Sequence, residues 1–182
     1  MMDTESQVAV FVRAVAFAAE KHRDQRRKDA GASPYINHPI ALANILANEG
    51  DVQDPVVLCA AVLHDTIEDT RTTADELQMH FGPEVTAVVL EVTDDKSLEK
   101  DERKQRQIGH APHISNEAKL VKLADKISNL RDILGTPPAD WSGDRRRAYF
   151  DWAARVVAGM RGIHPGLEGE FDRLLARQAE LD

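Results

Sequence analysis

The apolar and polar residues of this chain alternate with the period of an α-helix nearly throughout. Val8, Phe11 and Val15 recur at spacings of three and four residues, which places them on one face of a helix. Residues 55–69, PVVLCAAVLHDTIED, are apolar on every side as far as His64, a pattern typical of a helix at the centre of a domain. A later stretch repeats the helical spacing at Leu120, Leu123, Ala124, Ile127, Leu130 and Leu134.

Capping residues divide this pattern into separate helices. Asp54 followed by Pro55 predicts the start of the central helix, because aspartate caps a helix N-terminus and proline fits its first position. Thr73 and Glu76 have the spacing of a capping box. These signals predict helices that begin near residues 55 and 74.

Residues 84–94, EVTAVVLEVTD, follow Gly82–Pro83 and contain β-branched residues that also suit a strand. Such a strand would be isolated in an otherwise helical pattern, so we predict a helix here. The chain has 182 residues and shows no internal repeat, low-complexity tract or long linker. We therefore predict one all-α domain that spans residues 1–182, large enough to bury its own core.

The composition narrows the classes of function. Lys and Arg number 23 against 31 Asp and Glu, a net charge of −8, whereas nucleic-acid-binding domains usually have a basic balance. Cys59 is the only cysteine, which excludes an intrachain disulfide and suits a reducing compartment. The segment MMDTESQVAV lacks the basic start and apolar core of a signal peptide, and no apolar run approaches the ~20 residues that span a bilayer. We expect a cytoplasmic protein with neither a nucleic-acid nor a membrane partner.

Four ionisable residues end the apolar segment. At about 100° per residue, His64 and Glu68 share one helix face and Asp65 and Asp69 the adjoining one, so all four fit within an arc of about 140°. An unpaired buried charge costs several kcal/mol, roughly, which a bound divalent cation would offset. His38 and Asp125 would complete a set of two nitrogen and two oxygen ligands suited to Mn²⁺, Fe²⁺, Co²⁺ or Zn²⁺.

Each of these residues also has a simpler interpretation. His38 could be a loop histidine that caps the helix at Pro39. Asp125 could pair with Lys122 or Lys126 on a solvated face. Glu68 and Asp69 could merely end a helix, although carboxylates oppose the helix dipole at that end. The metal hypothesis depends on the combination of residues.

The order His…His-Asp…Asp resembles the signature of the HD phosphohydrolase superfamily, and HDTIED has the narrower HDxxED form. The chain resembles the hydrolase domain of the RelA/SpoT alarmone enzymes through RRKDAGASPYINHP, VLHDTIEDT, EVTDDK and AKLVKLADKISNLRD, in that order. These motifs span residues 20–132, with weaker similarity as far as YFDWAARVV. It particularly resembles the stand-alone small alarmone hydrolases, which include animal SpoT homologues.

This resemblance implies a compact helical HD-domain bundle that hydrolyses the 3′-pyrophosphate of ppGpp or pppGpp to GDP or GTP plus pyrophosphate. It implies that Glu68 and Asp69 assist the attacking water. No nucleotidyl-transfer domain follows, so we expect no synthetase activity. The implied ligands of one Mn²⁺ per chain are His38, His64, Asp65 and Asp125. The implied nucleotide contacts are Arg27, Lys28, Asn129 and Tyr149, with Lys100 and Arg145 at phosphate-contacting positions.

Positive charge is concentrated in two clusters, which a phosphate-rich substrate would need on an acidic protein. The first runs from Lys21 to Lys28 and precedes His38; the second is residues 145–147. Guanidinium groups bind phosphate with two hydrogen bonds and stack on bases. Either cluster could instead be a solvated helix face. We expect Arg27 and Lys28 to bind substrate, and Arg146 and Arg147 to be solvated.

Two other functions remain open from the sequence. The same metal chemistry could remove a phosphate from another nucleotide, such as the 2′-phosphate of NADPH. A catalytically silent HD module could sense a nucleotide, although such a module would be expected to lose some of the ligands or the Glu68–Asp69 pair. The sequence does not specify the oligomeric state.

Overall fold

The chain is all-α, as its periodicity predicts, in this computed structural model, which describes residues 6–181. Residues 1–5 of the segment MMDTESQVAV therefore lie outside the described range. Between residues 6 and 181, β pairing is limited to an isolated bridge between Arg26 and Pro34. The α-helices are α1 (Gln7–Lys21), α2 (Asn37–Asn44), α3 (Pro55–Leu63), α4 (Thr66–Asp69), α5 (Ala74–Val92), α6 (Lys100–His110), α7 (Asn116–Gly135), α8 (Gly143–Ala158) and α9 (Pro165–Ala176), with a π-helical turn at Ile45–Glu49 and a 3₁₀ turn at Arg177–Glu180.

The central helix is α3, as the apolar run predicts. Residues 59–63 are all buried, and α3 packs against α1, α2, α5 and α7. Its start is capped as expected: the Asp54 carboxylate accepts a hydrogen bond of 2.8 Å from the Val56 amide, and Pro55 occupies the first helical position. A helix that is apolar all round can thus be covered on every side.

Helix α5 contains the segment that could have been a strand, and the prediction of a helix over 84–94 is confirmed as far as Val92. Thr73 caps its start by accepting a hydrogen bond of 3.2 Å from the Glu76 amide. At Gly82 the backbone departs from helical geometry, with φ of 83° and ψ of 171°. This left-handed conformation favours glycine, and Pro83 begins the second half of α5.

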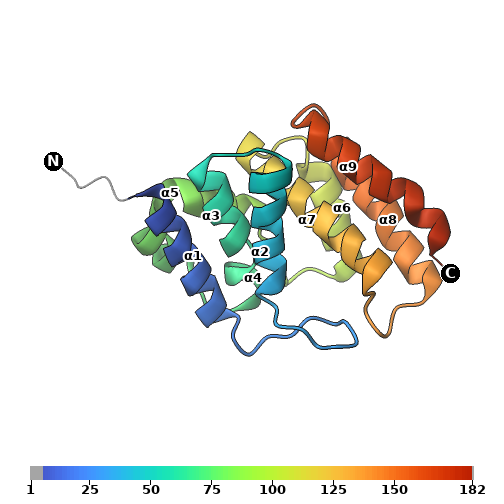
Figure 1. Cartoon of the computed structure of the whole chain (residues 1–182), viewed down its shortest axis with the longest axis horizontal. Helices are drawn as coiled ribbons and strands as arrows, with labels where there is room; N and C mark the ends of the chain where they lie inside the picture. Colours follow the sequence, from blue (N-terminus) through green and yellow to red (C-terminus); the bar gives the residue numbers. More distant parts are fainter. Residues whose placement is uncertain (1–5, 182) are drawn as a thin grey trace.

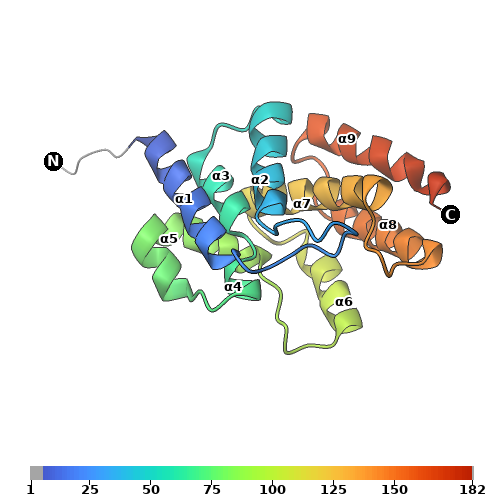
Figure 2. The ribbon, with the colours of Figure 1, turned by 60° about the horizontal axis from the view of Figure 1, so that its bottom comes forward.

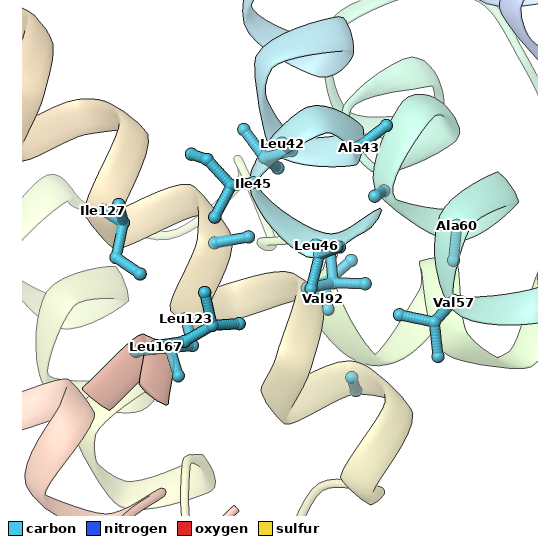
Figure 3. Packing of buried hydrophobic residues seen from close by; sticks show 14 of the residues in the cluster. Leu42, Ala43, Ile45, Leu46, Val57, Ala60, Val92, Leu123, Ile127 and Leu167 are labelled. Atoms are coloured by element: carbon cyan, nitrogen blue, oxygen red, sulfur yellow. The ribbon is translucent and has the colours of Figure 1, made fainter. Parts of the chain in front are cut away.

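The hydrophobic core lies between α2, α3, α5 and α7. Figure 3 shows Leu42 and Leu46 from the α2 region facing Leu123 on α7, with Val57 of α3 nearby. Leu42, Leu46 and Leu123 are fully buried. Leu167 of α9 closes the core beside α7. This packing holds α2, α3 and α7 in mutual contact.

The long connection between α1 and α2 lies against other parts of the fold. In Figure 1, α2 and α7 lie between α1, α3 and α5 on one side and α8 and α9 on the other. Figure 2 shows the connection running out towards α8 and returning to α2. The Ala139 amide donates a 3.1 Å hydrogen bond to the Lys28 carbonyl, which anchors the connection near the start of α8. Among the helices of residues 6–181, none is long and apolar enough to cross a membrane.

Candidate active site

Three elements bring the proposed metal ligands together. His38 lies in the first turn of α2, His64 and Asp65 follow the end of α3, and Asp125 lies on α7. These three helices pack against one another. His38 lies inside α2, so its interpretation as a loop histidine is wrong, and it is only 5% exposed. We call His38, His64, Asp65 and Asp125 the His/Asp cluster.

The helix predicted to run through His64 to Asp69 is interrupted. Helix α3 ends at Leu63, Asp65 has φ of −98° and ψ of 0°, and a short helix, α4, begins at Thr66. Two side chains explain the interruption, because they bond to carbonyls at the end of α3. The Thr66 hydroxyl donates to the Leu63 carbonyl at 2.7 Å, and the His64 Nδ1 atom bonds to the Ala61 carbonyl at 2.8 Å. The expectation of one continuous helix is therefore corrected.

Ligand atoms from three of the four residues, His38, His64 and Asp65, converge, and Asp125 lies beside them next to His38. The His64 Nε2 atom lies 2.9 Å from Asp65 Oδ2, and the His38 Nε2 atom lies 3.2 Å from Asp125 Oδ1. The two imidazole rings are 5.3 Å apart between centroids. One ligand atom each from His38, His64 and Asp65 lies within 4.8 Å of the others, so these residues could hold a metal ion.

The surroundings of the two histidines fit a metal site. The His64 Nδ1 atom bonds to a backbone carbonyl, and the His38 Nδ1 atom lies 3.3 Å from the Ser128 hydroxyl. In each ring the Nδ1 partner leaves Nε2 directed at the carboxylates, the arrangement that orients histidine ligands. Two nitrogen and two oxygen donors form a set that a divalent transition metal accepts.

Both carboxylates of the cluster are in the ionised form that metal binding requires. Burial alone would raise the pKa of Asp65, but His64 and the Tyr35 hydroxyl outweigh burial and hold this pKa well below its usual range. Burial likewise opposes ionisation of Asp125, and Lys126 outweighs it to lower the pKa of Asp125. The cluster therefore presents two negative charges in a largely buried place.

Two residues that the sequence reasoning did not assign to the site support these carboxylates. The Tyr35 hydroxyl donates a hydrogen bond to Asp65. The Lys126 ammonium lies 2.8 Å from Asp125 Oδ2, and its side chain is 4% exposed. The alternative that Asp125 pairs with Lys126 was thus correct. Its placement of this pair on a solvated face was wrong, because the pair is largely buried. The Asn129 amide also donates to Asp125, at 2.7 Å.

Glu68 and Asp69, the last two acids of the HDTIED motif, lie on different sides of the cluster. Glu68 accepts a 3.0 Å hydrogen bond from the Asp94 amide, and burial raises the pKa of Glu68 to about 7. Asp69 accepts a 2.9 Å hydrogen bond from Gln25 and also bonds to Lys96. Glu68 can accept a proton near neutral pH, because its pKa lies near that range.

A cavity of about 320 Å³, which we call the front cavity, opens on one side of the cluster. The expected nucleotide contacts Arg27, Lys28 and Asn129 line it. Tyr149 and Trp141 form its aromatic wall, with ring centroids 5.8 Å apart. The front cavity is also lined by Gln25, Arg26, Asp29, Tyr35, His38, Asp65, Asp69, Asp125, Asp132, Ile133, Thr136 and Pro138.

A smaller cavity of about 200 Å³, which we call the inner chamber, lies on the other side of the cluster. It shares Asp65 and Asp125 with the front cavity, and Asn129 and Tyr149 border both. The remaining wall of the inner chamber consists of His64, Glu68, Val92, Asp94, Gln107, Val121, Lys122, Lys126 and Trp152.

The two residues expected at phosphate-contacting positions lie outside both cavities. Lys100 and Arg145 are exposed and line neither of them. Arg145 stacks over Trp141 at 4.5 Å and lies 3.6 Å from Asp140. Arg147 pairs with Asp144 at 2.8 Å. The basic cluster before His38 does not act as one group. Lys21 pairs with Glu76 at 2.7 Å, whereas Arg27 and Lys28 line the front cavity.

The helical fold and the His/Asp cluster together define an HD-domain protein. A family model described as HD domain matches residues 14–149, and the chain belongs to this family.

Comparison with individual proteins shows which members of the HD-domain family this chain is similar to. The chain is 54% identical over 173 residues to guanosine-3′,5′-bis(diphosphate) 3′-pyrophosphohydrolase MESH1 of Xenopus tropicalis, covering 95% of this chain and 97% of the relative. It is 53% identical to the human protein of that name, with the same coverage. It is similar to a solved structure described as a metazoan orthologue of SpoT that hydrolyses ppGpp and plays a role in starvation responses. That match has a TM-score of 0.91 and 48% identity, and covers 96% of this chain and 97% of the other.

Proposed function

We propose that this protein is a Mn²⁺-dependent hydrolase that removes the 3′-pyrophosphate of ppGpp or pppGpp, giving GDP or GTP plus pyrophosphate. The observation that carries the proposal is a group of two imidazoles and one carboxylate whose ligand atoms lie within 4.8 Å of one another, with Asp125 beside His38, between a nucleotide-sized cavity and a second, polar chamber. The names of the relatives, which are similar along almost their whole length, support the substrate.

His38, His64, Asp65 and Asp125 would hold one ion per chain. When bound, the ion supplies a water of lowered pKa and polarises a phosphoryl oxygen. Tyr35 and Lys126 hold the two carboxylates in place through the bonds described above. If Tyr35 or Lys126 turned away, a buried carboxylate would lose a hydrogen-bond partner, which is costly.

Glu68 acts as the general base. Its pKa near neutrality lets it take a proton from the attacking water, and the hydrogen bond from the Asp94 amide fixes its orientation. Asp69 lies on the front-cavity side, where Gln25 and Lys96 hold it. From this position it orients the water or transfers a proton.

The front cavity binds the nucleoside. Arg27 is oriented by a 2.6 Å ion pair with Asp132, so its planar group is held at the cavity wall. Tyr149 and Trp141 offer aromatic faces to the base, and Asn129 can hydrogen-bond to it or to the ribose. Lys28 gives positive charge near the 5′-phosphates. Lys100 and Arg145 would reach a phosphate only at the margin of the site.

The decisive test is product analysis with purified protein and Mn²⁺. The proposal predicts pyrophosphate and GDP from ppGpp. Orthophosphate release from NADPH without any cleavage of ppGpp would instead identify an HD phosphatase for another nucleotide. Binding of ppGpp without turnover of either nucleotide would identify a silent sensing module.

We further propose that residues 1–182 form a single HD domain that acts in the cytoplasm on a free nucleotide, with no nucleic-acid partner. The net charge of −8 and the buried thiol of Cys59, whose pKa burial raises to about 11, support this. Fractionation of cells that express the protein tests the location.

A further inference from the structure

The inner chamber is a polar space that the steps above use only through Glu68. Because Asp65 and Asp125 border both cavities, a phosphorus atom at the cluster would have the front cavity on one side and the inner chamber on the other. A substrate group beyond that phosphorus, on the side away from the nucleoside, therefore points into the chamber.

Two lysines of α7 line the chamber one helical turn apart. Lys126, 3% exposed, is paired with Asp125 and lies 4.5 Å over the Trp152 ring. Lys122 is 7% exposed, and within the described part of the chain its ammonium reaches only the Val92 carbonyl, at the long distance of 3.4 Å. Across residues 6–181, no carboxylate lies within ion-pair distance of Lys122.

A buried lysine without an ion pair is costly to the fold. Burial lowers the pKa of Lys122, since the charged form loses its hydration. Replacement of such a charge by an apolar residue of similar size is often neutral or stabilising. The position of Lys122 in the chamber wall suggests that an anion from solution supplies the missing partner.

The acids of the chamber are committed to other partners. Glu68 accepts its bond from the Asp94 amide, and the Asp94 carboxylate accepts one from the Gln107 amide group. In the proposed reaction Glu68 also gains a proton, which removes its charge as the product forms. Lys122 is therefore left to bind a phosphate group of the incoming substrate, and the loss of charge on Glu68 favours the pyrophosphate that forms there.

We propose that the inner chamber holds the distal phosphate of the 3′-pyrophosphate, bound by Lys122, so that this residue selects diphosphoryl over monophosphoryl esters. The inference rests on the proposed function. Water adds its oxygen to the phosphorus attached to the ribose 3′ oxygen, and the bond between that phosphorus and the 3′ oxygen breaks. The 3′ oxygen finally gains the proton that the water has lost. Pyrophosphate then occupies the cluster and the chamber.

The test is Lys122→Met, with Lys119→Met on the same helix as the matched control, because Lys119 lines neither cavity. We expect Lys122→Met to lower kcat/KM for ppGpp about 10- to 100-fold, the effect of one charge-assisted hydrogen bond. The inhibition constant of guanosine 5′-diphosphate 3′-monophosphate, which lacks the distal phosphate, should not change. Equal losses for both nucleotides, or no loss for ppGpp, would overturn the inference.

Calorimetry with inorganic pyrophosphate separates this inference from the proposed function. Wild-type protein loaded with Mn²⁺ should bind pyrophosphate, Lys119→Met should bind it equally, and Lys122→Met should bind it at least about tenfold more weakly. An unchanged affinity in Lys122→Met, or no binding by the wild type, contradicts the chamber assignment whether or not ppGpp is cleaved. The Tm of Lys122→Met should equal or exceed that of the wild type, which excludes damage to the fold as the cause.

Discussion

At the scale of single residues, Glu68 combines a partly buried position with an expected chemical role. Its pKa of about 7 lies above the ordinary value of 4.5 because burial disfavours the charged form. Between pH 4.5 and pH 7 the unfolded chain loses this proton before the folded chain does. The free energy of unfolding therefore falls as pH rises through this window, and the full cost is present above pH 7.

We predict that Glu68→Gln separates activity from stability. The variant should lose most turnover, about 100-fold or more for removal of a general base, and should still bind the metal. In metal-free form at about pH 8 it should be more stable than the wild type, by on the order of 1–3 kcal/mol. Near pH 4.5 this difference should vanish. Thermal unfolding at both pH values and a turnover assay provide the measurements; full activity of the variant would refute the assigned role.

Individual ligands were predictable from the sequence because their residue types and order form a motif. His64-Asp65 with Glu68 and Asp69 stands out from an apolar segment even without a structure. Tyr35, Lys122 and Lys126 could not be assigned in this way. Tyr35 and Lys122 have partners 30 residues away, Asp65 and Val92, and the Lys126 pair with its neighbour Asp125 was predictable whereas its burial was not. No local spacing encodes the two distant contacts or that burial.

At the scale of elements, helix starts were predictable and the interruption after α3 was not. Asp54 and Thr73 cap helices as their positions predict, because a cap is a local interaction. The interruption at His64 and Asp65 depends on which carbonyls the side chains of His64 and Thr66 choose. A continuous helix satisfies the sequence pattern equally well. The interruption matters because it sets where Glu68 and Asp69 lie relative to the cluster.

The kink in α5 gives a prediction about an element. Gly82→Ala places a Cβ at φ of 83°, so we expect a loss of on the order of 1–3 kcal/mol in the free energy of unfolding. Gly169→Ala is the matched control, since Gly169 lies inside α9 and its added Cβ meets no atom within 4 Å. The control should be neutral or stabilising by up to about 1 kcal/mol. Denaturant unfolding compares them; equal stabilities would show that Gly82 is not required.

At the scale of the whole molecule, the site depends on packing between helices that are distant in sequence. The apolar core holds α2, α3 and α7 together (Figure 1). This packing fixes the distance between His38, His64 and Asp125. The all-α class follows from periodicity, but the two cavities do not, because they form where side chains of many elements fail to fill space. The connection from α1 to α2 runs towards α8 (Figure 2), and its residues between Gln25 and Tyr35 supply part of the wall of the front cavity.

The most direct measurement is a calorimetric titration of metal-free protein with Mn²⁺, in the wild type and in Asp65→Ala. Removal of Asp65 takes away one ligand and the partner of both His64 and Tyr35. We predict one Mn²⁺ per wild-type chain, no measurable binding to Asp65→Ala, and loss of ppGpp turnover in that variant. Wild-type protein that cleaves ppGpp without binding any divalent ion, or an Asp65→Ala protein that binds Mn²⁺ as well as the wild type, would contradict the account.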